Sequence, residues 1–287
     1  MTLAGGPTWW SPDPATVTDM SGVGGVEAND LTVVRGTRTA ITGATFTAPV
    51  GAITAIIGPN GAGKSTLLHA IAGLVRPSGG RLTVAGRAVR SASRDVAYVL
   101  QSTEVREHLP VSVREVVTMG RYARTGPFRP LRAADRHAVD DAMARLDVAD
   151  LAHRQIRELS GGQRQRVFVA QGLAQEAPVL LLDEPVTGLD LPSRRRILEV
   201  VTAERDAGRV VVMTTHDLGE AAHADQVLLV AGRIVAAGAP GEVLVADNLA
   251  AAYGQRLVHL GDGVVMLDDA PHHHEAGEVH PHPGHHH

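Results

Sequence analysis

The sequence predicts an α/β fold built around a largely parallel β-sheet. Short apolar runs typical of buried strands alternate with segments of helical periodicity, which is the pattern of strand–helix–strand units. One apolar run leads into a glycine-rich turn and a helix, and another ends in two adjacent carboxylates. Because parallel strands present their carboxyl ends at one edge of the sheet, the fold also predicts where a ligand binds.

Strands are predicted where short apolar runs are bounded by Gly, Pro or polar residues. They are Leu31–Val34, Ala52–Ile57, Arg81–Ala85, Val96–Leu100, Val179–Leu182 and Val210–Thr214. Helices are predicted where apolar residues recur three or four positions apart. They are Ser65–Leu74, Val113–Met119, Ala133–Leu146, Arg164–Ala174, Ser193–Arg205 and a helix near Leu218–Ala224. A hairpin is expected around Ala231–Gly232.

The chain divides into four segments by composition. Residues 1–25 are rich in Gly, Pro, Ser and Thr and lack periodicity, so we expect a disordered leader. Residues 26–245 form the predicted globular domain, in which about 102–158 are predicted to be a helical insert because their apolar residues recur at helical spacing. Residues 246–270 are expected to be a C-terminal extension and residues 271–287 a flexible His-rich tail.

Composition argues against several classes of protein. The 287 residues carry a net charge of −4, which disfavours a general nucleic-acid-binding surface, and their 44% hydrophobic content supports a sizeable core. The absence of cysteine excludes disulfides and thiolate metal sites, and it fits the cytosol. No secretory signal and no run of about 18 uncharged apolar residues is visible, so we expect any membrane association to come through a partner.

The chain has one lysine and 26 arginines, and the lysine lies in the glycine-rich turn. The turn fits the pattern G-x-x-x-x-G-K-[ST], in which backbone N–H groups and the start of the next helix face one anion. Lys64 is expected to reach the β- and γ-phosphates of ATP, and Ser65 to bind Mg²⁺. The alternative is a glycine-rich turn with an exposed lysine. The predicted ATP-binding residues here are Gly58, Pro59, Asn60, Gly61, Ala62, Gly63, Lys64, Ser65 and Thr66.

A second strand delivers Asp183 and Glu184 to the same predicted edge of the sheet. Asp183 is expected to hold Mg²⁺ through water, and Glu184 to polarise the attacking water. Taken alone, an acidic pair after a strand is typical of a solvated turn. Together with the phosphate loop, it predicts a site of ATP hydrolysis.

A third motif, Leu159–Gln163, precedes a predicted helix. Ser160 is predicted to be the N-cap of that helix, and the two adjacent glycines would expose backbone donors to a second anion. One ATP cannot occupy two such sites of one chain unless the sites face each other. The pattern therefore predicts a dimer with shared nucleotides.

Together these motifs resemble the nucleotide-binding subunits of ABC transporters, over about Val26–Val245. Leu159–Gln163 matches the signature sequence of that family letter for letter. The resemblance implies a P-loop NTPase core of ABC type with an N-terminal antiparallel β part and a helical subdomain. It also implies a homodimer that sandwiches two ATP molecules. The residues of each signature that would touch the other subunit's ATP are Ser160, Gly161, Gly162 and Gln163.

Further roles are implied by the resemblance, residue by residue. Gln101 resembles the glutamine that contacts Mg²⁺ and couples to the membrane subunits, and residues 188–190 resemble the D-loop. His216 resembles the switch histidine, which contacts the γ-phosphate and orients the region of Glu184. The predicted catalytic residues are Glu184, His216 and Gln101. The predicted Mg²⁺ ligands are Ser65, Gln101 and Asp183.

Arg35 departs from the pattern of the family. The family usually stacks adenine on an aromatic residue just after the first strand, and Arg35 stands at that position. Its planar guanidinium group can stack on a base, and the alternative is a simple surface charge. The sequence therefore leaves undecided which base the site selects, whereas it does predict the binding of the phosphates.

The cargo is indicated by two weaker features. Residues 112–122, 126–129 and 169–176 resemble ATPases of zinc and manganese importers and, less closely, those of iron-chelate importers. The C-terminal tail is rich in imidazole, a good ligand for Zn²⁺, although a purification remnant or a low-complexity tail is the alternative. Candidate transition-metal ligands there are His272, His273, His274, His280, His282, His285, His286 and His287.

We therefore predict the ATP-hydrolysing subunit of a metal-ion importer, with zinc first and manganese or an iron chelate as alternatives. It would use ATP and Mg²⁺ at the cytoplasmic face of the cell membrane, bound to a separate permease and, through it, to a solute-binding protein. A soluble ABC-type ATPase acting on DNA or ribosomes is a rival, but such proteins usually carry two cassettes, coiled coils or basic arms. A metal-storage or chaperone protein built around the tail is a second rival.

Overall fold

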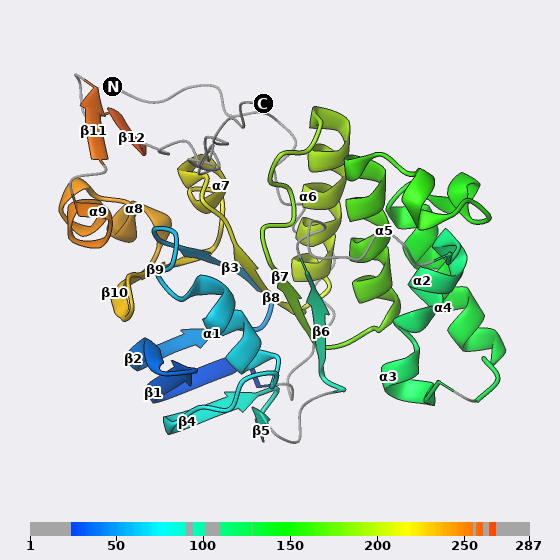
Figure 1. Ribbon diagram of the computed structural model, residues 1–287, viewed down its shortest axis with the longest axis horizontal. Helices are drawn as coiled ribbons and strands as arrows, with labels where there is room; N and C mark the ends of the chain where they lie inside the picture. Colours follow the sequence, from blue (N-terminus) through cyan, green and yellow to red (C-terminus); the bar gives the residue numbers. More distant parts are fainter. Residues whose placement is uncertain are drawn as a thin grey trace, which may run out of the picture.

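The computed structural model describes residues 24–89, 94–100, 110–127, 129–254, 257–260 and 264–267. Figure 1 shows two sheets with a helix between them on one side of the molecule and a group of helices on the other. The expected leader, apart from Gly24 and Gly25, lies outside the described residues, as do Gln101 and the His-rich tail.

The first sheet is antiparallel and has the strand order β2-β1-β4-β5. Its strands are β1 (Val26–Arg35), β2 (Arg38–Ala48), β4 (Gly79–Val84) and β5 (Arg87–Ala88). This sheet confirms the expected N-terminal antiparallel part. Strand β2 was not predicted, because shifts in its register with β1 break the alternation of buried and exposed residues that reveals a strand.

The second sheet has six strands, and all but one of its neighbouring pairs are parallel. Its order is β10 (Ile234–Gly238), β9 (Gln226–Val230), β3 (Ala52–Ile57), β8 (Val210–Thr214), β7 (Val179–Leu182) and β6 (Val96–Val99). Strand β10 pairs with β9 as the predicted hairpin and is antiparallel to it. Strands β3, β7 and β8 have the predicted bounds because each is a continuous apolar run, as expected for strands buried on both faces.

The two faces of this sheet belong to two hydrophobic cores. On β3, Ile56 packs in the core that contains α1 (Lys64–Ile71) and the antiparallel sheet, whereas Ile53 and Ile57 pack on the opposite face with the remaining helices. Helix α1 therefore lies between the two sheets, as Figure 1 shows. This packing fixes the start of α1 at the carboxyl edge of the parallel strands.

The helical part consists of α2 (Val113–Met119), α3 (Tyr122–Thr125), α4 (Ala133–Arg145) and two 3₁₀ turns, Ala149–Leu151 and Ile156–Glu158. It confirms that the described part of the predicted insert is helical. Helix α5 (Gly161–Ala174) packs against both α2 and α4, so it joins the insert to the sheet.

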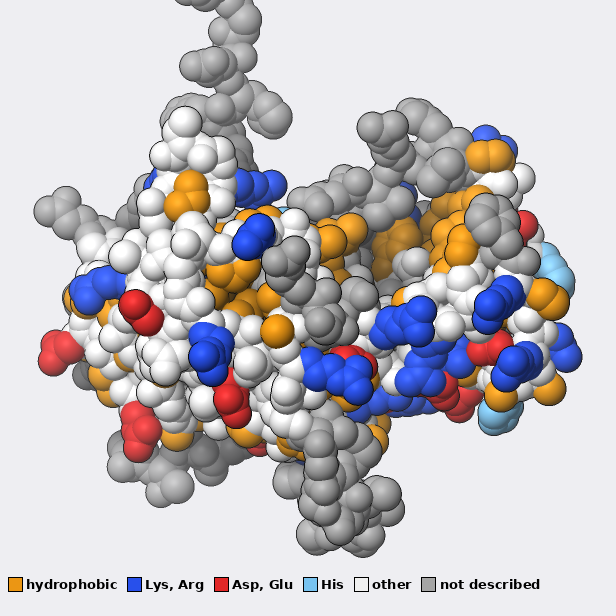
Figure 2. Space-filling view, turned by 90° about the horizontal axis from the view of Figure 1, so that it is seen from below, with side chains coloured by type: hydrophobic (Ala, Val, Ile, Leu, Met, Phe, Trp, Pro, Cys, Tyr) orange, Lys and Arg blue, Asp and Glu red, His pale blue; other side chains and the backbone are white. Residues whose placement is uncertain are grey.

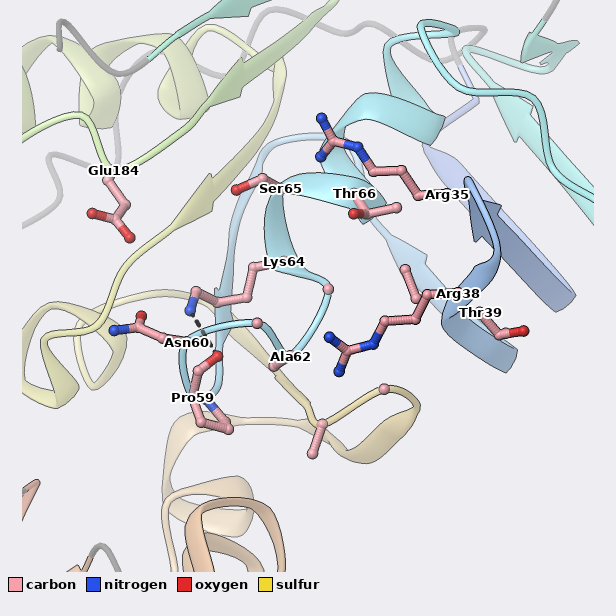
Figure 3. A pocket seen from close by; sticks show the side chains of 15 residues that line it. Arg35, Arg38, Thr39, Pro59, Asn60, Ala62, Lys64, Ser65, Thr66 and Glu184 are labelled. Carbon is pink, nitrogen blue, oxygen red and sulfur yellow. Dashed lines mark hydrogen bonds between the residues drawn. The ribbon is translucent and has the colours of Figure 1, made fainter. Parts of the chain in front are cut away.

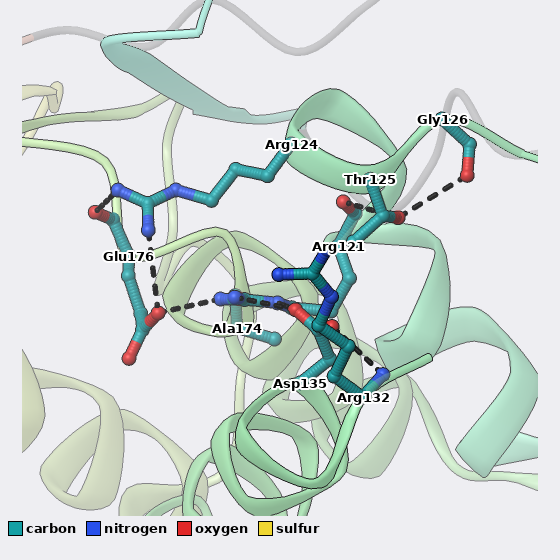
Figure 4. A network of polar contacts seen from close by, with 8 residues as sticks. All are labelled: Arg121, Arg124, Thr125, Gly126, Arg132, Asp135, Ala174 and Glu176. Carbon is teal, nitrogen blue, oxygen red and sulfur yellow. Dashed lines mark hydrogen bonds and ion pairs between the residues drawn. The ribbon is translucent and has the colours of Figure 1, made fainter. Parts of the chain in front are cut away.

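A buried guanidinium group ties this insert to the end of α5 (Figure 4). Arg121 donates to Asp135 Oδ1 from Nη2 at 2.8 Å, and from Nη1 to Ala174 O at 2.7 Å and Glu176 Oε2 at 2.6 Å. The hydrogen bonds from Arg121 lower the pKa of the Asp135 carboxyl. Since Arg121 and Asp135 are both buried, losing Arg121 would leave the Asp135 carboxylate in the core without its ion-pair partner.

The remaining helices are α6 (Leu191–Asp206), α7 (Leu218–Ala221), α8 (Pro240–Val243) and α9 (Ala246–Tyr253), followed by the antiparallel pair β11 (Leu257–Leu260) and β12 (Val264–Leu267). Helices α8 and α9 and the last two strands were not predicted. Leu249 and Tyr253 of α9 are buried in the main core, so this helix packs onto the domain. None of the helices in the described part of the chain is long and apolar enough to cross a membrane.

Candidate nucleotide site

The turn from β3 to α1 has a backbone that only glycine can adopt at two positions. Gly58 has φ +150°, and a Cβ atom there would lie 2.0 Å from the Val230 carbonyl oxygen of β9. Gly63 has φ +102°, and a Cβ atom there would lie 2.7 Å from Ala40 O. The glycines thus let the turn curl closely against neighbouring strands, so that the N–H groups at the start of α1 face one point.

Lys64 lies folded over this turn rather than in solvent. Its exposed fraction is 7%, and Nζ donates hydrogen bonds to Gly58 O at 2.7 Å and Pro59 O at 3.3 Å. Figure 3 shows the ammonium group above the loop on the side that faces Glu184. The structure thus contradicts the alternative of an exposed lysine. Backbone carbonyl groups hold a compact cation at the place where a phosphate group would meet the loop.

Hydroxyl groups from three elements converge on Asp183, which follows β7. Its Oδ1 accepts from Thr214 Oγ1 at 2.6 Å and from Ser65 Oγ at 3.4 Å, and its Oδ2 accepts from Tyr98 OH at 3.2 Å. Sequence reasoning missed Thr214 and Tyr98. The signal for Thr214 was a hydroxyl residue at the end of an apolar strand that neighbours β7.

Glu184 lies next to this cluster and lines the same cavity as the glycine-rich turn. Its φ of +45° places it in the left-handed region, which is strained for a residue with a side chain. Its backbone N–H donates to Thr214 Oγ1 at 2.9 Å, so one threonine positions both acidic residues. Glu184 Oε2 is 3.7 Å from His216 Nδ1. The structure thus brings these two predicted catalytic residues together.

The loop that carries His216 is tied to α6 by one arginine. Arg194 Nη2 lies 3.1 Å from both Asp217 Oδ2 and Glu220 Oε1, and Thr215 Oγ1 donates to Glu220 Oε2 at 2.6 Å. Burial raises the pKa of the Glu220 carboxyl. Nothing in the sequence distinguished Arg194 from the two arginines that follow it, so only the fold identifies it as a support for this loop.

The glycine-rich turn, Lys64 and Glu184 line a cavity of about 620 Å³ at the carboxyl edge of the parallel sheet (Figure 3). It holds all of the predicted phosphate-loop residues except Gly58, together with Glu184 and Arg35, and also Arg38, which sequence reasoning did not single out. Its lining residues are Arg35, Arg38, Thr39, Ala40, Pro59, Asn60, Gly61, Ala62, Gly63, Lys64, Ser65, Thr66, Glu184, Ala231 and Gly232.

The third predicted motif begins α5 and lies outside this cavity. The Ser160 hydroxyl accepts from the Gln163 N–H at 3.2 Å, and Gln163 Oε1 accepts from the Ser160 N–H at 3.1 Å, which confirms Ser160 as the N-cap. Gly162 packs so closely on the start of α6 that a Cβ atom would lie 2.3 Å from Asp190 Oδ2. A single chain therefore leaves this segment and the phosphate loop apart.

Sequence comparison identifies the family that has this combination of motifs. Residues 30–187 match the ABC transporter family. The chain belongs to the ABC transporter family. Because ATP-binding subunits of this family hydrolyse ATP, this ABC subunit is an ATPase whose fold supplies one ATP-binding domain.

Three curated relatives of this ABC ATPase differ in their named cargo. The manganese transport system ATP-binding protein MntA of Synechocystis sp. is 41% identical over 220 residues, which cover 76% of this chain and 85% of that protein. The chelated iron transport system membrane protein YfeB of Yersinia pestis is 39% identical, covering 81% and 80%. The cobalamin import ATP-binding protein BtuD of Halobacterium salinarum is 46% identical, covering 72% of this chain and 53% of that protein.

Solved structures confirm the fold of the ABC ATPase. An inward-facing structure of an ABC transporter assigned to the metal-chelate type superposes with a TM-score of 0.72 at 26% identity, covering 85% of this chain and 98% of that chain. The α/β core with its antiparallel sheet and helical part is therefore the fold that the resemblance implied.

Proposed function

We propose that this ABC ATPase drives the import of a transition-metal ion through a separate permease, with manganese as the first candidate cargo. The observation that carries the proposal is the 41% identity to the manganese ATP-binding protein, extending over 85% of that relative. The chelated-iron relative supports the same class of cargo. Cobalamin is less well supported, because the chain covers only 53% of that relative.

Zinc, the first choice from sequence alone, is the second candidate. It is favoured by the composition of the tail, in which eight of the 15 histidines of the chain lie within residues 271–287. Imidazole binds Zn²⁺ better than Mn²⁺, which prefers oxygen ligands. We propose that the tail binds metal as an accessory to transport. Deleting residues 271–287 should then abolish Zn²⁺ binding and leave ATP hydrolysis unchanged, and loss of hydrolysis would contradict this role.

The residues at the sheet edge fit Mg²⁺. The Ser65 hydroxyl and the Asp183 carboxylate lie 3.4 Å apart, and both offer the hard oxygen atoms that Mg²⁺ prefers. Such sites use one or two protein oxygens and leave the other positions to phosphates and water. Ser65 and Asp183 would hold Mg²⁺ there when ATP is bound, and the ion would supply positive charge that neutralises the phosphates. Gln101, the third predicted ligand, lies outside the described residues.

Within the proposed mechanism, each residue acts on the γ-phosphate or on the attacking water. Glu184 accepts a proton from the water, and His216, 3.7 Å away, orients Glu184 and contacts the γ-phosphate. Lys64 stabilises the charge that develops on the phosphate. These groups come from one chain.

A second copy of the chain would complete each site. Ser160 and Gly161 are exposed and Gln163 is half-buried at the start of α5, where the helix dipole favours an anion. We propose that ATP closes a homodimer in which these residues meet the γ-phosphate of the other subunit. Hydrolysis would then reopen the dimer.

The proposed domain division follows from this cycle. Residues 26–245 would be the ATPase domain, with about 102–158 as the helical subdomain that contacts the permease and transmits closure, and residues 246–270 as an extension. The subunit would lie at the cytoplasmic face of the membrane, held there by the permease, with a solute-binding protein on the far side.

Figure 2 shows basic side chains gathered on the helical part with acidic ones among them, unlike the uniformly basic surface of a nucleic-acid-binding protein.

Transport in a reconstituted system tests the proposed function. The subunit would be co-expressed with its permease and solute-binding protein, placed in liposomes with ATP inside or outside, and assayed for uptake of radioactive Mn²⁺ and Zn²⁺. We expect Mn²⁺ uptake only when ATP is on the side of the membrane where the subunit lies. Excess Zn²⁺ should inhibit this uptake only weakly. Preferred uptake of Zn²⁺ would reverse the order of the candidates. Hydrolysis without uptake of either metal would contradict metal import.

A further inference from the structure

Two arginines face each other across the tip of the β1–β2 hairpin. Arg35 and Arg38 are paired in register, and Gly36, with φ +62°, begins the two-residue loop between them. Directly paired residues project from the same face of a two-stranded ribbon with Cβ atoms about 5 Å apart, so like charges at these positions repel. The hairpin therefore places two cationic side chains on one face of its tip, and their guanidinium groups point to different parts of the cavity (Figure 3).

No acidic side chain in the described part of the chain pairs with either group. The guanidinium group of neither Arg35 nor Arg38 forms a hydrogen bond or ion pair with another described residue. In contrast, Arg121 is paired with both Asp135 and Glu176. Two guanidinium groups without a carboxylate partner are suited to an anionic ligand, because guanidinium binds phosphate through directed, charge-assisted hydrogen bonds.

Both side chains line the nucleotide cavity and extend from the hairpin toward the phosphate loop (Figure 3). Arg35 lies on the side of Thr66, and Arg38 on the side of Ala62. Since Lys64 and the N–H groups of the loop are suited to the β- and γ-phosphates, the arginines lie at the end of the cavity that remains for the α-phosphate, the ribose and the base.

We propose that Arg35 and Arg38 form a guanidinium clamp on the α-phosphate and base of the nucleotide, and that the site accepts GTP as well as ATP. Stacking on a planar cation tolerates any base because every base has a π-face, and phosphate contacts carry no information about the base. Choosing adenine over guanine requires hydrogen bonds to the base edge. The other residues at the hairpin end of the cavity have no carboxamide or carboxylate in their side chains; they are Thr39, Ala40, Ala231 and Gly232.

This inference rests on the proposed nucleotide cavity, so its test includes a variant of the phosphate loop. Full-length protein would be compared with Arg35→Gln, Arg38→Gln, the double variant and Lys64→Ala. Arg81→Gln is the matched control, because Arg81 is an exposed arginine of the same sheet that does not line the cavity. The measurements are steady-state hydrolysis of ATP and GTP, and thermal unfolding with and without each Mg²⁺–nucleotide.

We expect kcat/KM of the unchanged protein to differ by less than about tenfold between ATP and GTP. Each arginine variant should raise KM for both nucleotides by about tenfold, as expected for one charge-assisted hydrogen bond, with kcat little changed. The double variant without nucleotide should unfold at about the same temperature as the unchanged protein, because neither guanidinium group has a partner among the described residues, while its stabilisation by nucleotide should shrink. A merely structural role would instead lower the unfolding temperature without nucleotide.

Two results would overturn the clamp: a preference for ATP over GTP of more than about 100-fold, or a double variant with unchanged KM for both nucleotides. Lys64→Ala separates this failure from that of the cavity. If Lys64→Ala loses stabilisation by nucleotide while the double arginine variant keeps it, only the clamp is wrong. If Lys64→Ala keeps it, the cavity itself is wrongly assigned.

Discussion

The phosphate loop and the signature segment both place backbone N–H groups at the start of a helix, yet they are built differently. The loop before α1 is enclosed: Gly58 and Gly63 press against neighbouring backbone, and Lys64 is buried over the turn. The segment before α5 is open: Ser160 and Gly161 are exposed, and nothing lies within 4 Å of a Cβ atom built on Gly161.

The difference indicates which region is complete in one chain. The loop already meets Asp183 and Glu184, and through Glu184 it meets His216, so a single subunit holds a cation, two carboxylates and a histidine at one cavity. The signature segment has its own helix cap, but it lies outside the cavity that Lys64 and Glu184 line. A site shared between two copies requires one enclosed part, here the phosphate loop, and one accessible part, here the signature segment. Variants of each part test this comparison.

Changing the single lysine should have the largest effect. In Lys64→Arg, a planar fork of donors replaces a compact ammonium group that fits between Gly58 O and Pro59 O, 2.7 and 3.3 Å from Nζ. We expect ATP turnover to fall by at least about 10³-fold, because the donor that stabilises the developing charge is displaced. Phosphate release measures this, and turnover close to that of the unchanged protein would show that the loop does not need an ammonium group.

Glu184→Gln should slow hydrolysis by about 10²- to 10³-fold without loss of ATP binding, because it removes the proposed base but keeps its shape. The variant should accumulate as an ATP-bound dimer, which size-exclusion chromatography with light scattering detects. Lys64→Arg is the control that should remain monomeric. A Glu184→Gln protein that stays monomeric in saturating ATP would count against a shared site.

Alanine variants of Gly161 and Gly162 should distinguish a role in packing within the chain from a role in dimerisation. Gly162→Ala places a methyl group 2.3 Å from Asp190 Oδ2 and 2.5 Å from Ser193 Oγ, so we expect the free energy of unfolding to fall by about 1–3 kcal/mol. Gly161→Ala should leave the free energy of unfolding within about 0.5 kcal/mol, yet impair ATP-dependent dimerisation. Equal stability of the two variants in denaturant unfolding would refute the packing difference.

Glu220→Gln should have the smallest effect, on pH dependence. Because burial raises the folded-state pKa of Glu220 above its ordinary value of 4.5, the folded state binds more protons than the unfolded state, and this group's stabilising contribution is lost as pH rises through the folded-state pKa. The glutamine variant keeps an acceptor for Thr215 and removes this titration. Its stability should therefore fall less than that of the unchanged protein as pH rises above about 4.5. Parallel pH profiles in thermal unfolding would contradict the argument.

Local chemistry explains what could be predicted from the sequence. Continuous apolar runs predicted β3, β7 and β8 at their observed bounds, and the spacing of glycine, lysine and serine predicted a phosphate loop between a strand and a helix. Ser160 was predicted as an N-cap because a serine just before a predicted helix can accept a hydrogen bond from the backbone of the first turn. Helices α8 and α9 were missed, since they are short and their burial depends on packing against β9 and β10.

The sequence by itself determined the order of the predicted strands and helices and the residues that end β3, β7 and β8, because apolar periodicity and backbone-specific glycines are local properties. Only the tertiary structure decided which strands are neighbours. By placing β8 between β3 and β7, it made Thr214 the common support of Asp183 and Glu184. By closing the β1–β2 hairpin over α1, it turned Arg38 toward the cavity beside Arg35. These contacts join residues far apart in the chain, and no pattern within a single segment encodes them.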